Sequence, residues 1–422
     1  MTQLRITGRT PLEGSLVVSG RKNAALKLLA ASLLTDRPVT IRRLPDIGDV
    51  RTMMEILNQL GCQITHPEPG TVTVDASGVS DPVIPSDLGK ALRASIVLVG
   101  PLLARFGTVR FPHPGGCVIG KRSIEPHLEA FQSLGARIEQ QDDEYTMTAP
   151  RLTGSEIYLK EKSVTGTENL MMAACLANGS TVLYNAAEEH HIGNLADLLR
   201  NMGYRISGDG TSTVRIEGND SLSSQSAEIE TLPDEVEVGT FAVASVITGG
   251  HITLERVGSQ EGLFPILSTL DDFQVRYTYH PENQSLEILP SPGLTGNNVQ
   301  VAPWPGFPPD LQSPFTVLAT QAKGSSLIHD WMYEGRLYFV DLLQKMGADI
   351  VTCDPHRVLV SGPTELRHSS LISPDLRAGA ALVLAALTAE GTSTIEHAEL
   401  IDRGYAAIDE RLRSLGAQIT RE

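Results

Sequence analysis

The sequence has few cysteines, no long hydrophobic run and no excess of basic residues. Its four cysteines, Cys62, Cys117, Cys175 and Cys353, are widely scattered, so the close ligand spacing of a metal site is absent. No stretch reaches transmembrane length, and the first residues lack a charged region followed by an apolar run. We therefore expect a cytoplasmic protein with no metal and no membrane partner.

The charge balance is acidic. Lysine and arginine number 34 against 50 aspartate and glutamate residues, which gives a formal net charge of -16. This argues against general nucleic-acid binding, which relies on basic patches. The acidic balance does not exclude binding of small anionic substrates, because a few arginines in a cleft can outweigh a distant acidic surface. A chain of 422 residues is too long for one typical core, so we expect two or three domains.

One pattern recurs six times, at a period of about 70 residues, which is too long for a solenoid. Each copy is predicted to contain, in order, a helix, a strand, a second helix and two more strands. The second helix ends in a motif like Leu-Gly-x-x-Ile, and glycine suits the position that follows a helix. The equivalent positions are Gly61, Gly135, Gly203, Gln274 in a degenerate copy, Gly347 and Gly416.

The first copy shows why these segments form these elements. Residues 24–34 predict a compact apolar helix, and residues 39–41 predict a strand. Asp46 is expected to cap the next helix. Cys62 and Cys175 lie in apolar patterns and are expected to be small core residues.

Six units suggest two domains of three. The break is expected near Thr231, after a polar run at residues 219–226. The expected domains are residues 22–231, which carry Cys117, and residues 232–422. Residues 1–21 are expected to supply strands that complete the C-terminal domain.

The segment from His113 to Arg122 contains three glycines and a proline around one thiol, Cys117. Lys121 and Arg122 follow it, and nearby positive charge favours the thiolate. A reactive loop that closes over a ligand is one interpretation. An ordinary glycine-rich turn with a half-buried thiol is the other, and the loop alone does not decide between them.

The six repeats, the Pro-Gly-Gly-Cys loop at 114–117 and the segment Ser-Gly-Arg-Lys-Asn-Ala-Ala at 19–25 together resemble the UDP-N-acetylglucosamine 1-carboxyvinyltransferases. The resemblance covers essentially the whole chain. It implies an α/β fold of two inside-out α/β barrels, the enolpyruvyl transferase fold, with helices inside and sheets outside.

The implied reaction moves the enolpyruvyl group of phosphoenolpyruvate to the 3′-hydroxyl of UDP-N-acetylglucosamine and releases phosphate. This is the first committed step of peptidoglycan synthesis. It needs these two small molecules, no cofactor and no nucleic acid. The resemblance also implies that the epoxide phosphonate fosfomycin inactivates the enzyme.

The resemblance assigns Cys117 as the acid and Asp310, in Pro-Gly-Phe-Pro-Pro-Asp, as the base that takes the hydroxyl proton. Asp310 can also be the N-cap of the following helix. The residues implied for phosphoenolpyruvate are Lys22, Asn23, Arg122, Arg336, Arg377 and Arg403, with Asn23 also near the sugar. Those implied for UDP-N-acetylglucosamine are Arg93, Arg122, Ser123, Ile124, Glu125, Pro126, Ser163, Val164, Asp310 and Met332.

Three alternative interpretations remain, and two residues depart from the sequence pattern of the family. Arg93 can be an exposed helix residue with no ligand. The protein can be the sister enzyme that acts on shikimate 3-phosphate, although that enzyme lacks the Pro-Gly-Gly-Cys loop. It can also be a non-catalytic paralogue that binds the nucleotide sugar. Glu161 and Glu235 stand where members of the family often carry a basic residue.

Overall fold

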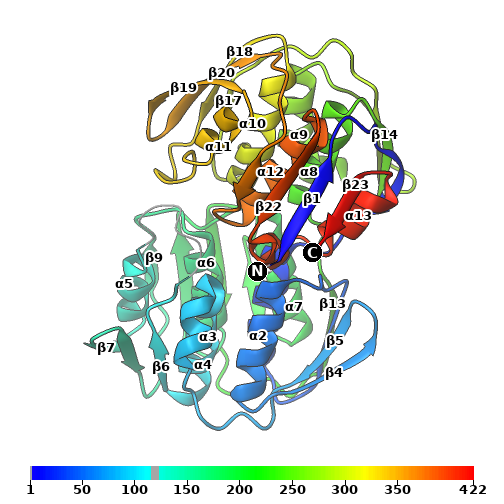
Figure 1. The fold of residues 1–422 in the computed structure, drawn as a ribbon. Helices are drawn as coiled ribbons and strands as arrows, with labels where there is room; N and C mark the ends of the chain where they lie inside the picture. The colour runs from blue at the N-terminus through cyan, green and yellow to red at the C-terminus, as the bar shows by residue number, and fades with distance from the viewer. Residues whose placement is uncertain (1, 116–122) are drawn as a thin grey trace. The chain divides into compact units, whose positions relative to one another are not determined.

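The computed structural model describes residues 2–115 and 123–422. These residues fold into two compact units (Figure 1). The N-terminal unit contains residues 20–115 and 123–232, and the C-terminal unit contains residues 2–19 and 233–422. Among the described residues, no helix is both long enough and apolar enough to span a membrane.

The N-terminal unit contains three of the six sheets found in the described residues, with strand orders β13-β3-β5-β4, β6-β8-β7 and β11-β12-β10-β9. Its strands are β3 (Val39–Arg42), β4 (Gln63–Glu68), β5 (Thr71–Asp75), β6 (Thr108–Pro112), β7 (Arg137–Gln141), β8 (Glu144–Thr148), β9 (Glu156–Tyr158), β10 (Ser180–Tyr184), β11 (Arg205–Ser207), β12 (Thr213–Glu217) and β13 (Ala227–Glu230). Its helices are α1 (Lys22–Ala31), η1 (Ser32–Leu34), α2 (Gly48–Gln59), α3 (Ser86–Ala91), η2 (Arg93–Leu98), α4 (Val99–Phe106), α5 (Glu125–Ser133), α6 (Val164–Ala174) and α7 (His190–Asn201).

The C-terminal unit contains the other three sheets, with strand orders β21-β22-β1-β23, β15-β16-β14-β2 and β17-β18-β20-β19. Its strands are β1 (Gln3–Thr7), β2 (Glu13–Val17), β14 (His251–Glu255), β15 (Arg276–His280), β16 (Ser285–Leu289), β17 (Val299–Gln300), β18 (Gly324–His329), β19 (Asp349–Asp354), β20 (Arg357–Gly362), β21 (Ser370–Ile372), β22 (Thr392–Glu396) and β23 (Gln418–Arg421). Its helices are α8 (Glu235–Ile247), α9 (Gln260–Asp272), η3 (Pro309–Leu311), α10 (Gln312–Gln321), α11 (Val340–Lys345), α12 (Leu376–Thr388), η4 (Ala398–Arg403) and α13 (Ile408–Ser414).

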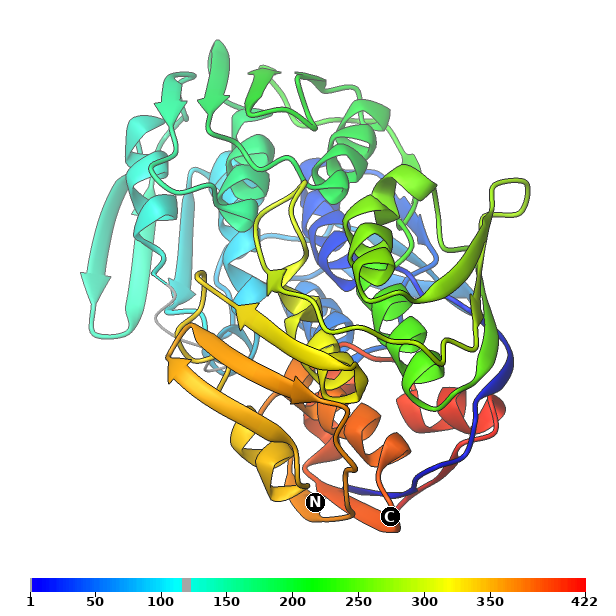
Figure 2. The same cartoon turned by 90° about the horizontal axis from the view of Figure 1, so that it is seen from above.

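Helices form the interior of each unit. Every residue of α8 is buried, and α8, α10 and α12 pack against one another. A helix that is buried on all sides requires cover on all sides, and strands of the C-terminal unit lie around these helices (Figure 2). In the N-terminal unit, α6 packs against α4 and α7, and α1 packs against α7. Helices inside and sheets outside confirm the predicted fold class.

The repeat endings take the backbone conformation that the sequence predicts. The five glycines have positive φ: Gly61 at 106°, Gly135 at 91°, Gly203 at 90°, Gly347 at 98° and Gly416 at 96°. In the degenerate copy, Gln274 takes φ of 59° although it carries a side chain. The left-handed turn after the helix is therefore kept in all six copies, and glycine makes it without strain in five.

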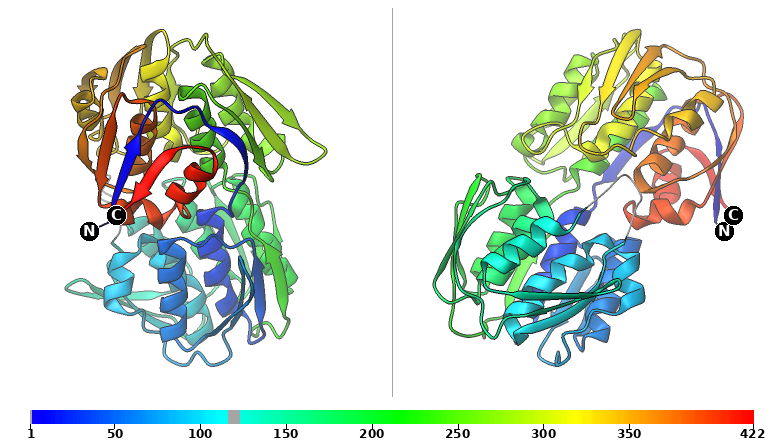
Figure 3. Two further views of the ribbon diagram at one scale, coloured as in Figure 1. Left: turned by 45° about the vertical axis from the view of Figure 1, so that its right-hand side comes forward. Right: turned by 90° about the vertical axis from the view of Figure 1, so that its left-hand side faces the viewer.

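The first strand lies within a sheet built mainly from the end of the chain. β1 pairs antiparallel with both β22 and β23, and β2 pairs parallel with β14. The backbone of Gln3 donates to the carbonyl of Glu422 over 2.9 Å, so the two ends of the chain meet (Figure 3).

Two local predictions differ in outcome. The apolar helix predicted at residues 24–34 is present as α1 followed by the 3-10 turn η1. The predicted cap at Asp46 is wrong, because Ile47 occupies the N-cap of α2 and the Asp46 carboxylate pairs with Arg51 Nε at 2.7 Å. Cys62 and Cys175 are buried, as predicted.

Candidate active site

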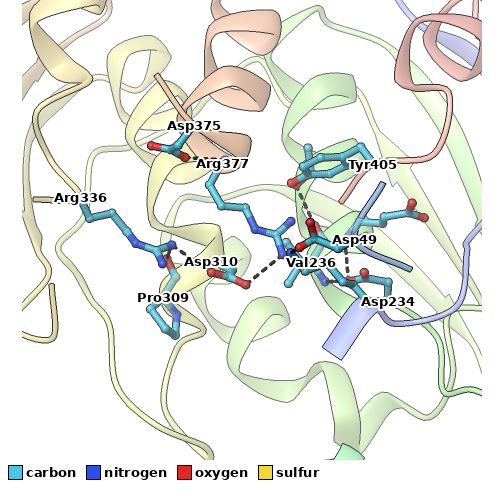
Figure 4. A network of polar contacts seen from close by, with 12 residues as sticks. Asp49, Asp234, Val236, Pro309, Asp310, Arg336, Asp375, Arg377 and Tyr405 are labelled. Atoms are coloured by element: carbon cyan, nitrogen blue, oxygen red, sulfur yellow. Dashed lines mark hydrogen bonds and ion pairs between the residues drawn. The ribbon is translucent and has the colours of Figure 1, made fainter. Parts of the chain in front are cut away.

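Asp310 lies in the 3-10 turn η3, directly before α10. Its two carboxylate oxygens are held by two different guanidinium groups (Figure 4). Arg336 Nη1 donates to Oδ1 over 3.0 Å, and Arg377 Nη2 donates to Oδ2 over 2.9 Å. The alternative role of Asp310 as the N-cap of α10 is wrong, because Leu311 occupies the N-cap position. No side chain makes a capping hydrogen bond there. The carboxylate is thus placed by arginines and not by a helix end.

Arg336 follows β18 and is buried, with 8% of its side chain exposed. It also donates to the carbonyl of Pro309 over 3.1 Å, and its guanidinium lies 4.9 Å from the ring centroid of Tyr333. The buried carboxylate of Asp330 stands 3.9 Å from its Nε. Burial alone lowers the pKa of Arg336, but Asp310, Tyr333 and Asp330 together more than offset this, so the pKa is raised. Arg336 therefore stays cationic.

Arg377 is the second residue of α12. Asp375 caps this helix and accepts hydrogen bonds from the backbone of Arg377 at 2.8 Å and of Ala378 at 3.0 Å. The guanidinium lies 5.3 Å from the ring centroid of Tyr405, whose hydroxyl is 2.8 Å from the Thr240 hydroxyl. Burial lowers the pKa of Arg377, but Asp310, Tyr405 and Asp234 together outweigh burial, so the pKa is raised.

The two arginines have donors to spare. Within the part of the chain that the structure describes, Arg336 Nε and Arg377 Nη1 are buried and make no hydrogen bond. A buried donor without a partner costs about 1–3 kcal/mol, and more if it is charged. Guanidinium groups in this state are suited to bind a carboxylate or phosphate. Of the other predicted residues here, Met332 packs partly against the core and Arg403 ends η4, half-buried.

Lys22 and Asn23 begin α1 in the N-terminal unit, and both are half-buried. Lys22 Nζ forms an ion pair with the buried Asp49 carboxylate at 2.7 Å. The first turn of α1 contains no acidic residue, so the positive end of the helix dipole adds to the charge of Lys22. This end of α1 is receptive to an anion.

Arg93 begins η2 and contacts two backbone carbonyls that lie 21 and 30 positions further along the chain. Its Nη1 donates to the carbonyl of Pro114 over 3.2 Å, and its Nη2 donates to the carbonyl of Ser123 over 3.1 Å. Arg93 is therefore held by backbone contacts and is partly buried, and its role at the sugar nucleotide stays a prediction. Cys117 and Arg122, which belong to the segment between these two carbonyls, lie outside the described residues.

The remaining residues predicted for the sugar nucleotide lie at the starts of α5 and α6. Ser123 Oγ accepts a hydrogen bond from the backbone of Glu125 over 3.0 Å, Ile124 is buried, and Pro126 is the second residue of α5. Ser163 caps α6 by accepting from the backbone of Gly166 over 3.1 Å, and Val164 is the first residue of that helix.

His127 joins these two helix starts. Its Nε2 lies 3.1 Å from the Thr165 hydroxyl, and its Nδ1 lies 3.2 Å from Asn169 Nδ2. The structure thus brings the residues predicted at 123–126 close to those at 163–164.

The sequence did not indicate Asp49, Asp330 or Tyr405 as parts of the site. Asp49 and Tyr405 each face a predicted residue from another segment, whereas Asp330 faces Arg336, which follows it closely in the sequence. Only the fold reveals these contacts. Of the two departures, Glu161 is exposed and Glu235 is a buried residue that begins α8. Among the described residues, no group of three or more histidine, cysteine, aspartate or glutamate side chains could hold a metal ion.

Comparisons with known proteins identify the family. The sequence model of the family described as EPSP synthase (3-phosphoshikimate 1-carboxyvinyltransferase) matches residues 6–412. The UDP-N-acetylglucosamine 1-carboxyvinyltransferase of Porphyromonas gingivalis is 42% identical over 100% of both chains. That of Treponema denticola is 40% identical over 99% of both chains.

Solved structures share the fold. The enolpyruvyl transferase NikO from Streptomyces tendae has a TM-score of 0.89 at 25% identity and covers 100% of this chain and 98% of its own. An EPSP synthase from Acinetobacter baumannii has a TM-score of 0.76 at 18% identity over 100% of both chains, which concerns the fold alone. The family match and the relatives at about 40% identity both span nearly the whole sequence. The chain therefore belongs to the EPSP synthase family of enolpyruvyl transferases, and within it to the UDP-N-acetylglucosamine 1-carboxyvinyltransferases.

Proposed function

We propose that this protein transfers the enolpyruvyl group of phosphoenolpyruvate to the 3′-hydroxyl of UDP-N-acetylglucosamine, releasing phosphate, in the first committed step of peptidoglycan synthesis. The observation that carries the proposal is the Asp310 carboxylate between two buried arginines that retain unused donors. A base beside an anion-binding pair is what this chemistry requires. The full-length relatives are enzymes of this name.

In the proposed reaction, the sugar hydroxyl oxygen attacks the central carbon of phosphoenolpyruvate while Asp310 takes the hydroxyl proton. Cys117 delivers a proton to the methylene carbon, which makes the central carbon electrophilic. The Cys117 thiolate then takes a proton back from the resulting methyl group as phosphate leaves, which restores the enol double bond, and the proton on Asp310 passes to the departing phosphate. Atoms and charge balance without a cofactor.

Cations bind the phosphate and carboxylate of phosphoenolpyruvate in this proposal. Lys22, Arg122, Arg336, Arg377 and Arg403 fill this role, together with the amide of Asn23. Among those that the structure describes, Arg336 and Arg377 each have a buried donor atom that makes no hydrogen bond, and Lys22 lies at a positive helix end. The sugar nucleotide is proposed to bind Arg93, Met332 and the helix starts at 123–126 and 163–164.

Phosphate release tests this proposal. We expect the purified protein to release phosphate from phosphoenolpyruvate with UDP-N-acetylglucosamine and not with shikimate 3-phosphate. Release with shikimate 3-phosphate alone would assign it to the sister reaction. No release with either acceptor, despite binding of the sugar nucleotide, would favour a non-catalytic paralogue. A cytoplasmic location remains part of the proposal, and fractionation of the source cells would check it.

A further inference from the structure

The N-terminal unit contains three buried ionisable side chains that the proposed reaction does not use. Lys27 of α1, Glu168 of α6 and His191 of α7 have side chains that are 4%, 0% and 2% exposed. Lys27 Nζ lies 3.2 Å from Glu168 Oε2, and His191 Nε2 lies 3.3 Å from Glu168 Oε1. We name these three residues the Glu168 cluster. Two of the helices that meet here, α6 and α7, are labelled in Figure 1.

Burial makes the ionised forms of the Glu168 cluster energetically unfavourable. Burial raises the pKa of Glu168 to about 7, and burial lowers the pKa of both Lys27 and His191. Removing an ion pair from water costs several kcal/mol per ion, and an apolar pair of similar size is often at least as stable. Stability alone is therefore a weak reason for charged residues at these positions.

Other charged groups surround the cluster. Arg21 and Lys22 act on Lys27 from the start of α1. Glu189 acts on Glu168, and His190 acts on His191, both from the start of α7. Each lysine of α1 has its own carboxylate partner: Glu168 contacts Lys27, and Asp49 contacts Lys22.

The cluster lies one helical turn inside the ends that carry predicted substrate residues. Lys27 follows Asn23 by four positions in α1, and Glu168 follows Val164 by four positions in α6. Residues four apart lie on the same face of a helix. The Lys27–Glu168 contact therefore joins the face of α1 that carries Asn23 to the face of α6 that carries Val164.

The start of α1 needs such support. The side chain of its N-cap residue, Arg21, makes no capping hydrogen bond, and its first turn has no acidic residue. Cations at this end oppose the helix dipole, so carboxylates from neighbouring elements have to balance them. Asp49 does this for Lys22 at 2.7 Å, and Glu168 does it for Lys27 at 3.2 Å.

We propose that Glu168, through its ion pair with Lys27, is a positioning residue that fixes the first turn of α1 and thereby the orientation of Lys22 and Asn23 toward phosphoenolpyruvate. Glu168 does not touch the substrate. The claim about phosphoenolpyruvate rests on the proposed function, whereas the claim about α1 does not.

The kinetic experiment compares Glu168→Gln with the double variant Lys27→Met/Glu168→Leu. Leu198→Ala is the matched control, because Leu198 is fully buried in α7 but lies about two helical turns beyond His191. We expect Glu168→Gln to raise the KM for phosphoenolpyruvate about tenfold, with a smaller change in kcat. The double variant should regain the melting temperature of the unmodified protein and keep the raised KM. A KM that returns to normal together with the melting temperature would overturn the proposal.

Hydrogen exchange tests the claim about α1 without any substrate. The amide of Ala25 donates to the carbonyl of Arg21 over 3.0 Å and reports on the first turn. We expect its exchange to accelerate in Glu168→Gln and not in Leu198→Ala. Unchanged exchange in folded Glu168→Gln would overturn the positioning role. If the unmodified protein released no phosphate while Glu168→Gln still loosened α1, the proposed function would fail and the positioning role would stand.

Discussion

Arg377 donates a hydrogen bond to the Oδ2 atom of Asp310 over 2.9 Å, although the two residues are 67 positions apart. The same guanidinium is proposed to bind an anion of phosphoenolpyruvate. Asp310 and the substrate therefore compete for one donor group. We expect the bound anion to draw Arg377 partly away from Asp310, which leaves the carboxylate better able to accept the hydroxyl proton. The ion pair thus links substrate binding to the base.

Asp310→Asn should fold and bind the sugar nucleotide but turn over about 10² to 10⁴ times more slowly, because an amide cannot accept the hydroxyl proton. Phosphate release measured at saturating substrates checks this. Asp354→Asn is the control, since Asp354 ends β19 and pairs with the exposed Arg357 of β20, so its loss should leave turnover unchanged. Near-normal turnover in Asp310→Asn would remove Asp310 from the base role.

Arg377→Lys should raise the KM for phosphoenolpyruvate by about tenfold or more, because one ammonium group cannot reproduce the planar fork of a guanidinium. Lysine at this position keeps the charge beside Asp310, so the melting temperature should fall less than in Arg377→Met. Initial rates over a range of phosphoenolpyruvate concentrations measure the effect. Arg357→Lys, at an exposed ion pair, is the matched control. Equal KM values for both variants would exclude Arg377 from the anion site.

The repeat endings are the part of the fold that the sequence predicts best, because their signal is local. A glycine after an apolar helix indicates a left-handed turn, and the turn is present at Gly61 and its equivalents. Gln274 follows the same geometry without the glycine, so the degenerate copy was recognisable only from the period.

Contacts between distant segments could not be predicted in the same way. Lys27 and Glu168 each lie in an apolar helix pattern, and nothing nearby in the sequence indicates that they face each other. Asp46 shows that even a local prediction can fail, because a guanidinium within reach competes with a helix end for the same carboxylate. The predicted site residues came from motif resemblance, whereas their partners Asp49 and Asp330 came from the fold.

His127 is expected to make stability depend on pH. Burial, followed by the charge of Arg93, lowers the pKa of His127 from 6.5 to about 3. Between these values the unfolded chain binds the proton more readily, so stability is full above about pH 6.5 and falls as the pH drops, by at most about 1.4 kcal/mol per pH unit. Protonation would also break the hydrogen bond that Nδ1 accepts from Asn169.

Urea unfolding at several pH values between about 4 and 7.5 measures this dependence. His127→Gln keeps a polar side chain but removes the titrating group, so its free energy of unfolding should fall less steeply with acid. Both proteins share all other titrating groups, so the contributions of these groups cancel when the two free energies of unfolding are subtracted. The same slope in both proteins would contradict the prediction.

Cys117 should be the single thiol that an epoxide phosphonate such as fosfomycin alkylates. The reagent resembles phosphoenolpyruvate, and the cations near Cys117 in sequence, Lys121 and Arg122, favour the reactive thiolate. The described cysteines react less readily on two grounds. Burial raises the pKa of Cys62 to about 12 and raises that of Cys175 as well. Cys353 is exposed, but it lies on β19 in the C-terminal unit, and no cation among the predicted site residues belongs to that strand.

Time-dependent loss of activity, faster with UDP-N-acetylglucosamine present, is the expected result, and mass spectrometry should find one adduct on Cys117. Cys353→Ser is the control for the exposed thiol and should be inactivated at the same rate as the unmodified protein. Cys117→Asp should keep activity, because a carboxylic acid can also deliver the proton, and should lose all labelling. An adduct on Cys353, or full sensitivity of Cys117→Asp, would show that the inhibitor acts elsewhere. The acid role of Cys117 would then lose its support, whereas the base role of Asp310 would not be affected, because it rests on separate contacts.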